Sequence, residues 1–313
     1  MFGWSDRRRF AGAALAALAA TAAGSAARAQ VPDVCPPGEP GCAVAVLSAA
    51  DARARAALVA SGGSPVPGSA STLGRRTAHS RRATAAARLS LGPASTFRSA
   101  PVPGGTVRDG ALVALAVDGA IALFDGFFAA PTVGGVLSID ALGSLGWVGG
   151  GGPIEIDGGL TWAVGARVGV FRESFTLPGL AVSVMYRGIG SLAVVDSAAP
   201  TWSADADALA VRATLGKRLG GVDAFAGVAW DRSDGSLGVS YVNQSAVREE
   251  AIVRDHSEAR WAGFGGLGYT FLVFQLAAEA GWQGGGEGYA EEGFEIGASK
   301  GRPFGSVSFR FTY

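Results

Sequence analysis

Residues 304–313 read Phe-Gly-Ser-Val-Ser-Phe-Arg-Phe-Thr-Tyr, and apolar and polar residues alternate from Ser306 to the end. Successive side chains of a strand point to opposite faces, so this stretch has one apolar face and one polar face. A tilted strand of about 9–11 residues is long enough to cross a bilayer. The stretch therefore predicts a membrane-spanning strand with its apolar face outward and its polar face toward a wet interior.

The same alternation, broken by Gly, Pro and Asp, recurs upstream. We expect strands at 83–91, 108–118, 134–148, 158–173, 178–192, 204–217, 221–233, 257–271, 273–284 and 304–313. Many exceed the five or six residues that are usual in soluble sheets. The predicted fold class is all-β, a transmembrane antiparallel up-and-down β-barrel of about ten strands. Eight strands are an alternative, and so are twelve if 236–243 and 248–254 form a further hairpin.

The C-terminal residues also carry a resemblance to a known class. The ending Ser306–Tyr313, with alternate aromatics and a terminal Tyr, resembles the β-signal of bacterial outer-membrane β-barrels. The similarity in patterning extends over residues 83–313 and indicates no subfamily. It implies location in the outer membrane, contact with outer-membrane lipid, and recognition of Phe309, Phe311 and Tyr313 by the barrel-assembly machinery.

The connections between the expected strands differ in length. Outer-membrane barrels have short periplasmic turns and longer outer loops, so we expect 149–157, 193–203, 234–256 and 285–303 outside. With this assignment one aromatic set falls near the outer strand ends: Trp147, Trp162, Trp230, Trp261 and Trp282. A second set falls toward the inner ends: Phe171, Tyr269, Phe271, Phe274, Phe311 and Tyr313. Two aromatic belts are thus predicted, because amphipathic rings favour the membrane interface.

The first 29 residues are typical of an export signal. Arg7–Arg9 precede an Ala/Leu-rich run, and Ala27-Arg28-Ala29 matches a small-x-small cleavage site. Residues 1–29 are therefore expected to be a signal peptide, with Sec and twin-arginine export both open. No later helix is expected to span a membrane, because the best candidate, 111–130, contains two Asp residues. Charged residues are only 17% and the net charge is zero, which argues against nucleic-acid binding.

Residues 30–82 differ in composition from the barrel region, 83–313. Cys35 and Cys42 predict a small disulfide loop in an oxidising compartment, with a two-Cys metal site as the rival. Ser48 begins a candidate short helix that ends at Val59. Residues 61–82 are rich in Gly, Ser, Pro and Arg, which favours a flexible linker. We expect the whole segment to lie in the periplasm.

The polar faces of the strands supply the candidate lumen residues. Together with Arg88 they are Arg167, Arg187, Arg212, Arg260, Arg310, Asp140, Asp223 and Glu279. Such a set could form an anion-favouring constriction or solute site. A salt-bridged, closed interior is favoured, because a barrel of about eight to ten strands is nearly filled by its own side chains.

No catalytic or cofactor motif is persuasive. Gly263–Gly268 matches G-x-G-x-x-G but lies within an expected strand rather than at a strand-to-helix turn. Asp255 and His256, with acidic neighbours, invite comparison with omptin-type proteases, yet there one residue separates the catalytic Asp and His, whereas here the two are adjacent. We therefore expect no enzyme, cofactor or metal. The favoured function is a structural or surface-interaction barrel with a largely plugged lumen and an extracellular ligand. A narrow pore or small-solute transporter is the alternative, and an outer-membrane hydrolase the remote one.

Overall fold

Antiparallel strands around one helix make up most of the described part of this chain in its computed structural model. The structure describes residues 35–36, 40–77, 80–97, 107–128, 134–151, 156–175, 177–194, 202–242, 247–285, 290–291, 294–295 and 301–313. All of them belong to one compact unit, Asp33–Tyr313. The expected signal peptide, 1–29, lies outside the described residues.

The described elements are one helix and fifteen strands. They are α2 (Pro40–Ser61), β1 (Arg75–Thr77), β2 (Ser80–Arg81), β3 (Ala83–Phe97), β4 (Val107–Phe124), β5 (Ser138–Gly151), β6 (Ile156–Asp157), β7 (Gly159–Phe171), β8 (Gly179–Val194), β9 (Trp202–Leu219), β10 (Val222–Val242), β11 (Arg248–Phe271), β12 (Phe274–Gln283), β13 (Ala290–Glu291), β14 (Phe294–Glu295) and β15 (Arg302–Thr312). In the described residues no helix is both long and apolar enough to cross a membrane.

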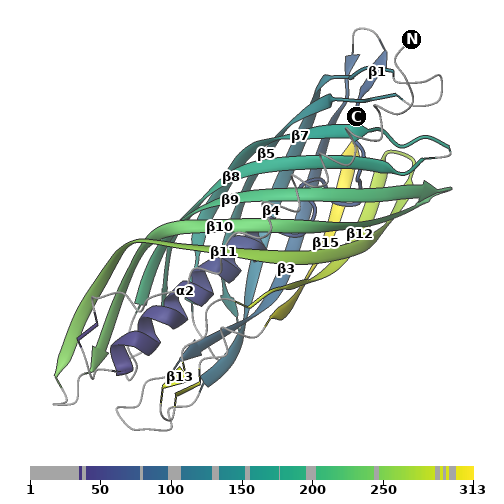
Figure 1. The fold of residues 1–313 in the computed structure, drawn as a ribbon. Coiled ribbons are helices and arrows are strands. Elements are labelled where there is room, and N and C mark those ends of the chain that lie inside the picture. The colour runs from purple at the N-terminus through teal and green to yellow at the C-terminus, as the bar shows by residue number, and fades with distance from the viewer. Residues whose placement is uncertain are drawn as a thin grey trace, which may run out of the picture. The chain divides into compact units, whose positions relative to one another are not determined.

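Ten of these strands close into a barrel (Figure 1). Each long strand pairs antiparallel with the next along the chain, from β3 to β12 and then β15, and β15 pairs with β3 to complete the ring. The expected fold and strand number are confirmed. We call the end with the tight β9–β10 and β11–β12 connections the turn end, and the opposite end the loop end.

Several strands are longer than the sequence suggested: β3 and β4 extend to Phe97 and Phe124, and the largest extensions are those of β10 and β11. Residues 234–256 were expected to be a loop, but β10 and β11 remain paired as far as Val242 and Arg248. The segments considered for an eleventh and twelfth strand do pair, but only as continuations of β10 and β11 past an irregularity beside Gly235. Their inward residues, such as Leu237 and Val253, are buried in a core that also includes α2. The sequence did not predict that these extensions are ordered, because the helix that packs against them was expected in the periplasm.

The outer face carries the two expected aromatic belts. Trp261 and Trp282 are exposed toward the loop end, while Phe271 and Phe274 are exposed beside the β11–β12 turn. Trp282 lies eight positions after Phe274. At about 3.4 Å per residue and a tilt of about 40°, eight residues span roughly 21 Å, close to the roughly 25 Å height of a membrane barrel's apolar band.

Candidate functional site: the barrel interior

The barrel interior contains α2 and the chain that follows it, which we together call the interior segment (residues 40–73). α2 packs against the inner faces of several barrel strands, mainly β3, β9 and β10 (Figure 1). Between Val46 and Leu73 nearly every residue whose burial is described is buried. The expected periplasmic placement of 30–82 is therefore wrong for this part of it. The helix is also longer than the expected Ser48–Val59.

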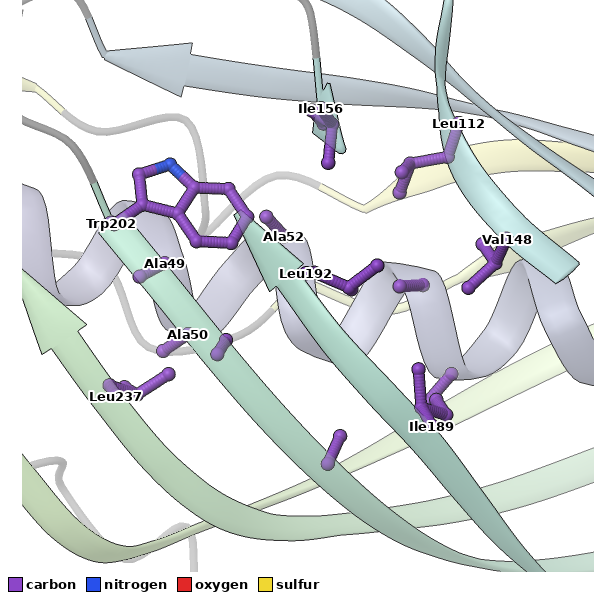
Figure 2. Close-up of a cluster of buried hydrophobic side chains, with 14 of the residues drawn as sticks. Ala49, Ala50, Ala52, Leu112, Val148, Ile156, Ile189, Leu192, Trp202 and Leu237 are labelled. Carbon is purple, nitrogen blue, oxygen red and sulfur yellow. The ribbon is translucent and has the colours of Figure 1, made fainter. Parts of the chain in front are cut away.

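Apolar packing holds the half of the interior segment nearest the loop end. Figure 2 shows Ala49, Ala50 and Ala52 of α2 among larger side chains of the barrel wall. These wall residues are Leu112, Val148, Ile156, Ile189, Leu192, Trp202 and Leu237. A helix with ordinary side chains is about 10–12 Å wide, and the many alanines of α2 reduce that width. The helix therefore fits inside the barrel and gives its wall a buried core.

A glycine ends α2 and redirects the chain. Gly62 has a φ of +63°, in the left-handed region, and its N–H donates to the Leu58 carbonyl at 2.8 Å. This is a common helix ending, in which glycine avoids the penalty that a Cβ brings to this conformation. A Cβ here would also lie only 2.5 Å from Nη1 of Arg88. The position accordingly favours glycine for two independent reasons.

Two wall arginines bind backbone carbonyls around this turn. Arg88 donates through Nη1 to the Ser61 carbonyl and, at 3.2 Å, to that of Ser64. Arg212 donates through Nε to the Gly63 carbonyl at 3.0 Å. The last carbonyls of a helix lack intrahelical partners, so these guanidinium groups satisfy atoms that would otherwise be buried without one. Each arginine is thus a ligand of the main chain as well as a partner in an ion pair.

Each of these arginines is also paired with a carboxylate of the wall. Arg88 lies 3.0 Å from Asp118, and Arg212 lies 2.7 Å from Asp231. All four side chains are almost fully buried. Pairing and hydrogen bonding together offset the desolvation penalty of burying these charges.

Glu279 binds the same turn as a hydrogen-bond acceptor, whereas the two arginines bind it as donors. Its two carboxylate oxygens accept from the Gly63 N–H at 2.6 Å and the Ser64 N–H at 3.0 Å. Oε1 also accepts from the Ser306 hydroxyl at 2.9 Å. Hydrogen bonds to an ionised acceptor are stronger than neutral ones. The turn at 62–64 is consequently bound through both its carbonyls and its N–H groups.

Wall side chains also donate hydrogen bonds to main-chain carbonyls of the interior segment closer to the turn end. Gln275 donates to the Gly68 carbonyl at 3.0 Å, and Arg310 donates to the Pro67 carbonyl at 2.9 Å. Because these contacts fix the main chain, the interpretation of 61–82 as a flexible linker is wrong for the part that belongs to the interior segment. A flexible linker would have a solvated backbone, whereas here the wall provides hydrogen-bond partners.

Asp140 is the other acidic contact of this stretch. Its Oδ2 accepts from the Leu73 N–H at 3.0 Å and from Arg167 Nη2 at 2.7 Å. Asp140 is fully buried, and Arg167 also donates to the Ser69 carbonyl at 3.3 Å. One ion pair of the wall therefore holds two points of the interior segment.

Arg260 pairs with the helix itself. It lies 2.7 Å from Asp51 of α2 and 2.7 Å from Glu258 of its own strand. Asp51 also pairs with Arg55 one helical turn later, at 2.7 Å. No sequence pattern predicts that Asp51 faces Arg260, because the two residues are 209 positions apart.

The structure places all the candidate lumen residues inside the barrel. The buried set is Arg88, Arg167, Arg187, Arg212, Arg260, Arg310, Asp140, Asp223 and Glu279. Most of them contact the interior segment as described above. Asp223 instead accepts from Arg218 at 2.8 Å and Gln275 at 2.6 Å, and for Arg187 no ion pair is found within the described part.

His256 lies inside the barrel extension, five residues beyond Trp261 toward the loop end. Its Nδ1 accepts from Arg53 Nη2 at 2.8 Å, and its carbonyl accepts from the same nitrogen at 2.9 Å. Burial first, and then the charges of Arg53 and Arg260, lower the pKa of the His256 imidazole. The neighbouring Asp255 side chain lies outside what the structure describes. Within the described residues, no cluster of three or more acidic, His or Cys side chains could hold a metal.

The remaining sequence candidates lie near the beginning of α2 and in the last strand. Cys35 and Cys42 form a disulfide at the beginning of α2, with Cα atoms 5.6 Å apart. Phe309, Phe311 and Tyr313 point outward from the last strand and its end. Phe274 stacks on Phe309, with ring centroids 5.4 Å apart. Their expected role in assembly concerns a partner that the structure does not contain.

The geometry defines the class of this molecule as a transmembrane-type, closed antiparallel β-barrel with an occupied interior. No family model matches the chain, and no curated protein matches it. It is similar to the outer membrane protease OmpT from Escherichia coli at 10% identity, over 78% of this chain and 100% of that one, with a TM-score of 0.41. It is similar to the translocator domain of the autotransporter NalP from Neisseria meningitidis at 13% identity, over 75% and 89%, with a TM-score of 0.41. It also resembles the toluene transporter TodX of Pseudomonas putida at 8% identity, over 79% and 95%, with a TM-score of 0.27.

Proposed function

We propose that the protein is an outer-membrane barrel whose lumen is closed by its own interior segment and that it acts through its loop end rather than by conduction. The observation that carries this proposal is the use of lumen charges as ligands of the main chain between Ala60 and Leu73. In an open pore these arginines and carboxylates would face water and solute. Here their hydrogen bonds are made with the chain itself.

The sidedness follows from the lengths of the connections. Short turns are typical of the periplasmic side of such barrels, so the turn end would face the periplasm and the loop end the cell exterior. The apolar outer face between the aromatic belts would contact outer-membrane lipid. The barrel-assembly machinery would recognise the exposed aromatic residues of the last strand, as the β-signal resemblance implies.

A rigid platform at the loop end supports a surface-interaction role. The paired extensions of β10 and β11 go beyond Trp230 and Trp261, and α2 supplies the buried core behind them. Binding residues are often found on loops that a rigid scaffold positions. An extracellular ligand would accordingly be bound by the connections at this end.

The two alternatives receive less support. A narrow pore or small-solute transporter would need a path past the interior segment. A hydrolase would need a reactive group at the loop end, but the Nδ1 of His256 already accepts a hydrogen bond from Arg53. We therefore propose a non-enzymatic protein without a cofactor.

Single-channel conductance of the refolded mature protein tests the closed lumen. We expect no conductance from residues 30–313 and sustained steps from a matched protein that lacks 30–74. Both samples must first show heat-modifiable gel mobility, which demonstrates a folded barrel. Steps from the full mature chain would favour the pore, and silence from both proteins would show that the interior segment is not what closes the lumen.

A further inference from the structure

The direction in which the chain runs through the barrel is fixed by contacts at both ends of the interior segment. Arg53 of α2 donates to His256, which lies on the extension of β11 toward the loop end. At the other end of the segment, the Leu73 N–H donates to Asp140, which is close to the start of β5 and therefore to the turn end. The chain thus runs from the loop end to the turn end inside the barrel.

The beginning of α2 lies well past the outer aromatic belt. His256 is five positions beyond Trp261 of that belt, which is roughly 13 Å along the barrel axis at about 3.4 Å per residue and a tilt of about 40°. The residues from Pro40 to Ala52 precede Arg53 in the helix, and at about 1.5 Å per residue they add roughly 20 Å. The helix therefore begins far outside the apolar band that would cross the membrane.

The chain that precedes α2 is attached to this same end of the barrel. Cys35 forms a disulfide with Cys42, which belongs to the first turn of the helix. Cys35 also packs against the buried cluster that contains Trp202 and Val239, two residues of the wall near the loop end. Pro36, the next residue, is exposed. The disulfide thus ties the chain before the helix to the loop end.

One passage through the lumen therefore precedes the ten strands of the barrel wall. After the interior segment the chain reaches the turn end, where the Ala83 N–H at the start of β3 donates to the Tyr313 carbonyl at 3.1 Å. Ten strands then bring the chain back to the turn end at Tyr313. Cys35 and Tyr313 thus lie at opposite ends of the barrel. In a barrel that spans a membrane, the two ends face different compartments.

We propose that the protein presents the chain that precedes α2 on the cell exterior, and that this chain crosses the outer membrane through the lumen of its own barrel. The proposal rests on the sidedness of the proposed function, in which the loop end is outside. The disulfide loop Cys35–Cys42 then belongs to the loop-end platform, beside the extensions of β10 and β11. A disulfide and several prolines limit the conformational entropy that such a loop loses on binding, which suits a surface contact.

Epitope tags at three positions test the proposal in cells that express the full chain. One tag is placed between Gln30 and Val31, a second after Ala198 in the β8–β9 connection at the loop end, and a third between Gly220 and Gly221 in the β9–β10 turn. An antibody does not cross the outer membrane, so labelling of intact cells reports the exterior. We expect the first two tags to be labelled on intact cells and the third only after permeabilisation. Heat-modifiable gel mobility must first show that each tagged barrel is folded.

The outcomes separate this proposal from the proposed sidedness. If the tag after Gln30 is labelled only in permeabilised cells while the β8–β9 tag is labelled on intact cells, the proposal is overturned and the sidedness stands. Labelling of the Gly220 tag alone on intact cells would overturn the sidedness and the exterior placement together. If the tag after Gln30 prevents folding, protease treatment of intact cells with the wild-type protein decides. Release of peptides from residues 30–39 supports the proposal, whereas their retention, with release of peptides from 195–201, overturns it.

Discussion

Replacing Glu279 with Gln should loosen the interior segment without removing it. The carboxylate is buried and accepts from the N–H groups of Gly63 and Ser64 and from the Ser306 hydroxyl. Glutamine has nearly the same size but only one acceptor oxygen. Its amide nitrogen must therefore face one of these donors, so that two donors oppose each other in a buried place.

The size of the effect follows from these contacts. A hydrogen bond to a charged group contributes about 1.5–3 kcal/mol, and a buried donor left unsatisfied costs about 1–3 kcal/mol. Loss of one such bond with partial relaxation should destabilise the bound turn by about 2–3 kcal/mol. At about 1.4 kcal/mol per factor of ten, the segment should open about 30 to 150 times more often.

Hydrogen–deuterium exchange of the refolded barrel measures this opening directly. Peptides that cover residues 62–73 should exchange faster in Glu279→Gln, while peptides from the long barrel strands should keep their protection. Glu250→Gln is the matched control, because Glu250 is exposed on the extension of β11. Unchanged exchange in the 62–73 peptides would refute the idea that Glu279 holds the turn.

Three further perturbations test other contacts of the same molecule. Asp140→Asn should lower the free energy of unfolding in urea by about 3–5 kcal/mol, because it leaves Arg167 buried without its partner. Adding Arg167→Met should recover part of that loss. A double variant whose loss equals the sum of the two single losses would contradict the pairing. Because the pKa of His256 is lowered in the folded protein, the imidazole of the unfolded chain is protonated at a higher pH than that of the folded chain. The stability that this residue contributes is therefore complete above about pH 6.5 and is lost as the pH falls toward the lowered folded pKa. His256→Gln should remove this part of the pH dependence of urea unfolding, and an unchanged profile would argue against it. Phe311→Ala combined with Tyr313→Ala should reduce the folded fraction on heat-modifiable gels of outer membranes, whereas normal insertion would count against the β-signal interpretation.

The barrel was predictable because its rules are local. Alternation with period two places side chains on two faces, and the medium on each side selects apolar or polar residues. The last strand, Arg302–Thr312, obeys this pattern from Ser306 onward, and its borders differ from the expected ones by only one or two residues. The inward position of residues such as Arg167 and Glu279 follows from the same parity.

The interior segment was not predictable because its order comes from distant partners. Residues 62–73 have the Gly, Ser and Pro content of a linker, and no local pattern opposes that interpretation. Gly63 is bound by Glu279, which is 216 positions away. The helix gave an equally weak signal, because its alanines form no clear apolar stripe and its charged residues, Asp51 to Arg55, fit a solvated surface. Only the closed barrel brings these groups together.

The chemistry of the contacts explains why composition was such a poor guide here. The wall binds the turn and the chain after it largely through main-chain carbonyls and N–H groups, which every residue except proline carries in full. Recognition of this kind places few demands on side-chain identity, so the bound sequence can look like a linker and still be fixed. The demand is strict only where conformation matters, as at Gly62, whose φ is in the left-handed region. In this molecule the specificity belongs to the wall, where Arg88, Arg212 and Glu279 are placed by strand register. A sequence search for an ordered plug should therefore look for charged residues on the inner faces of the barrel strands rather than for a pattern in the plug itself.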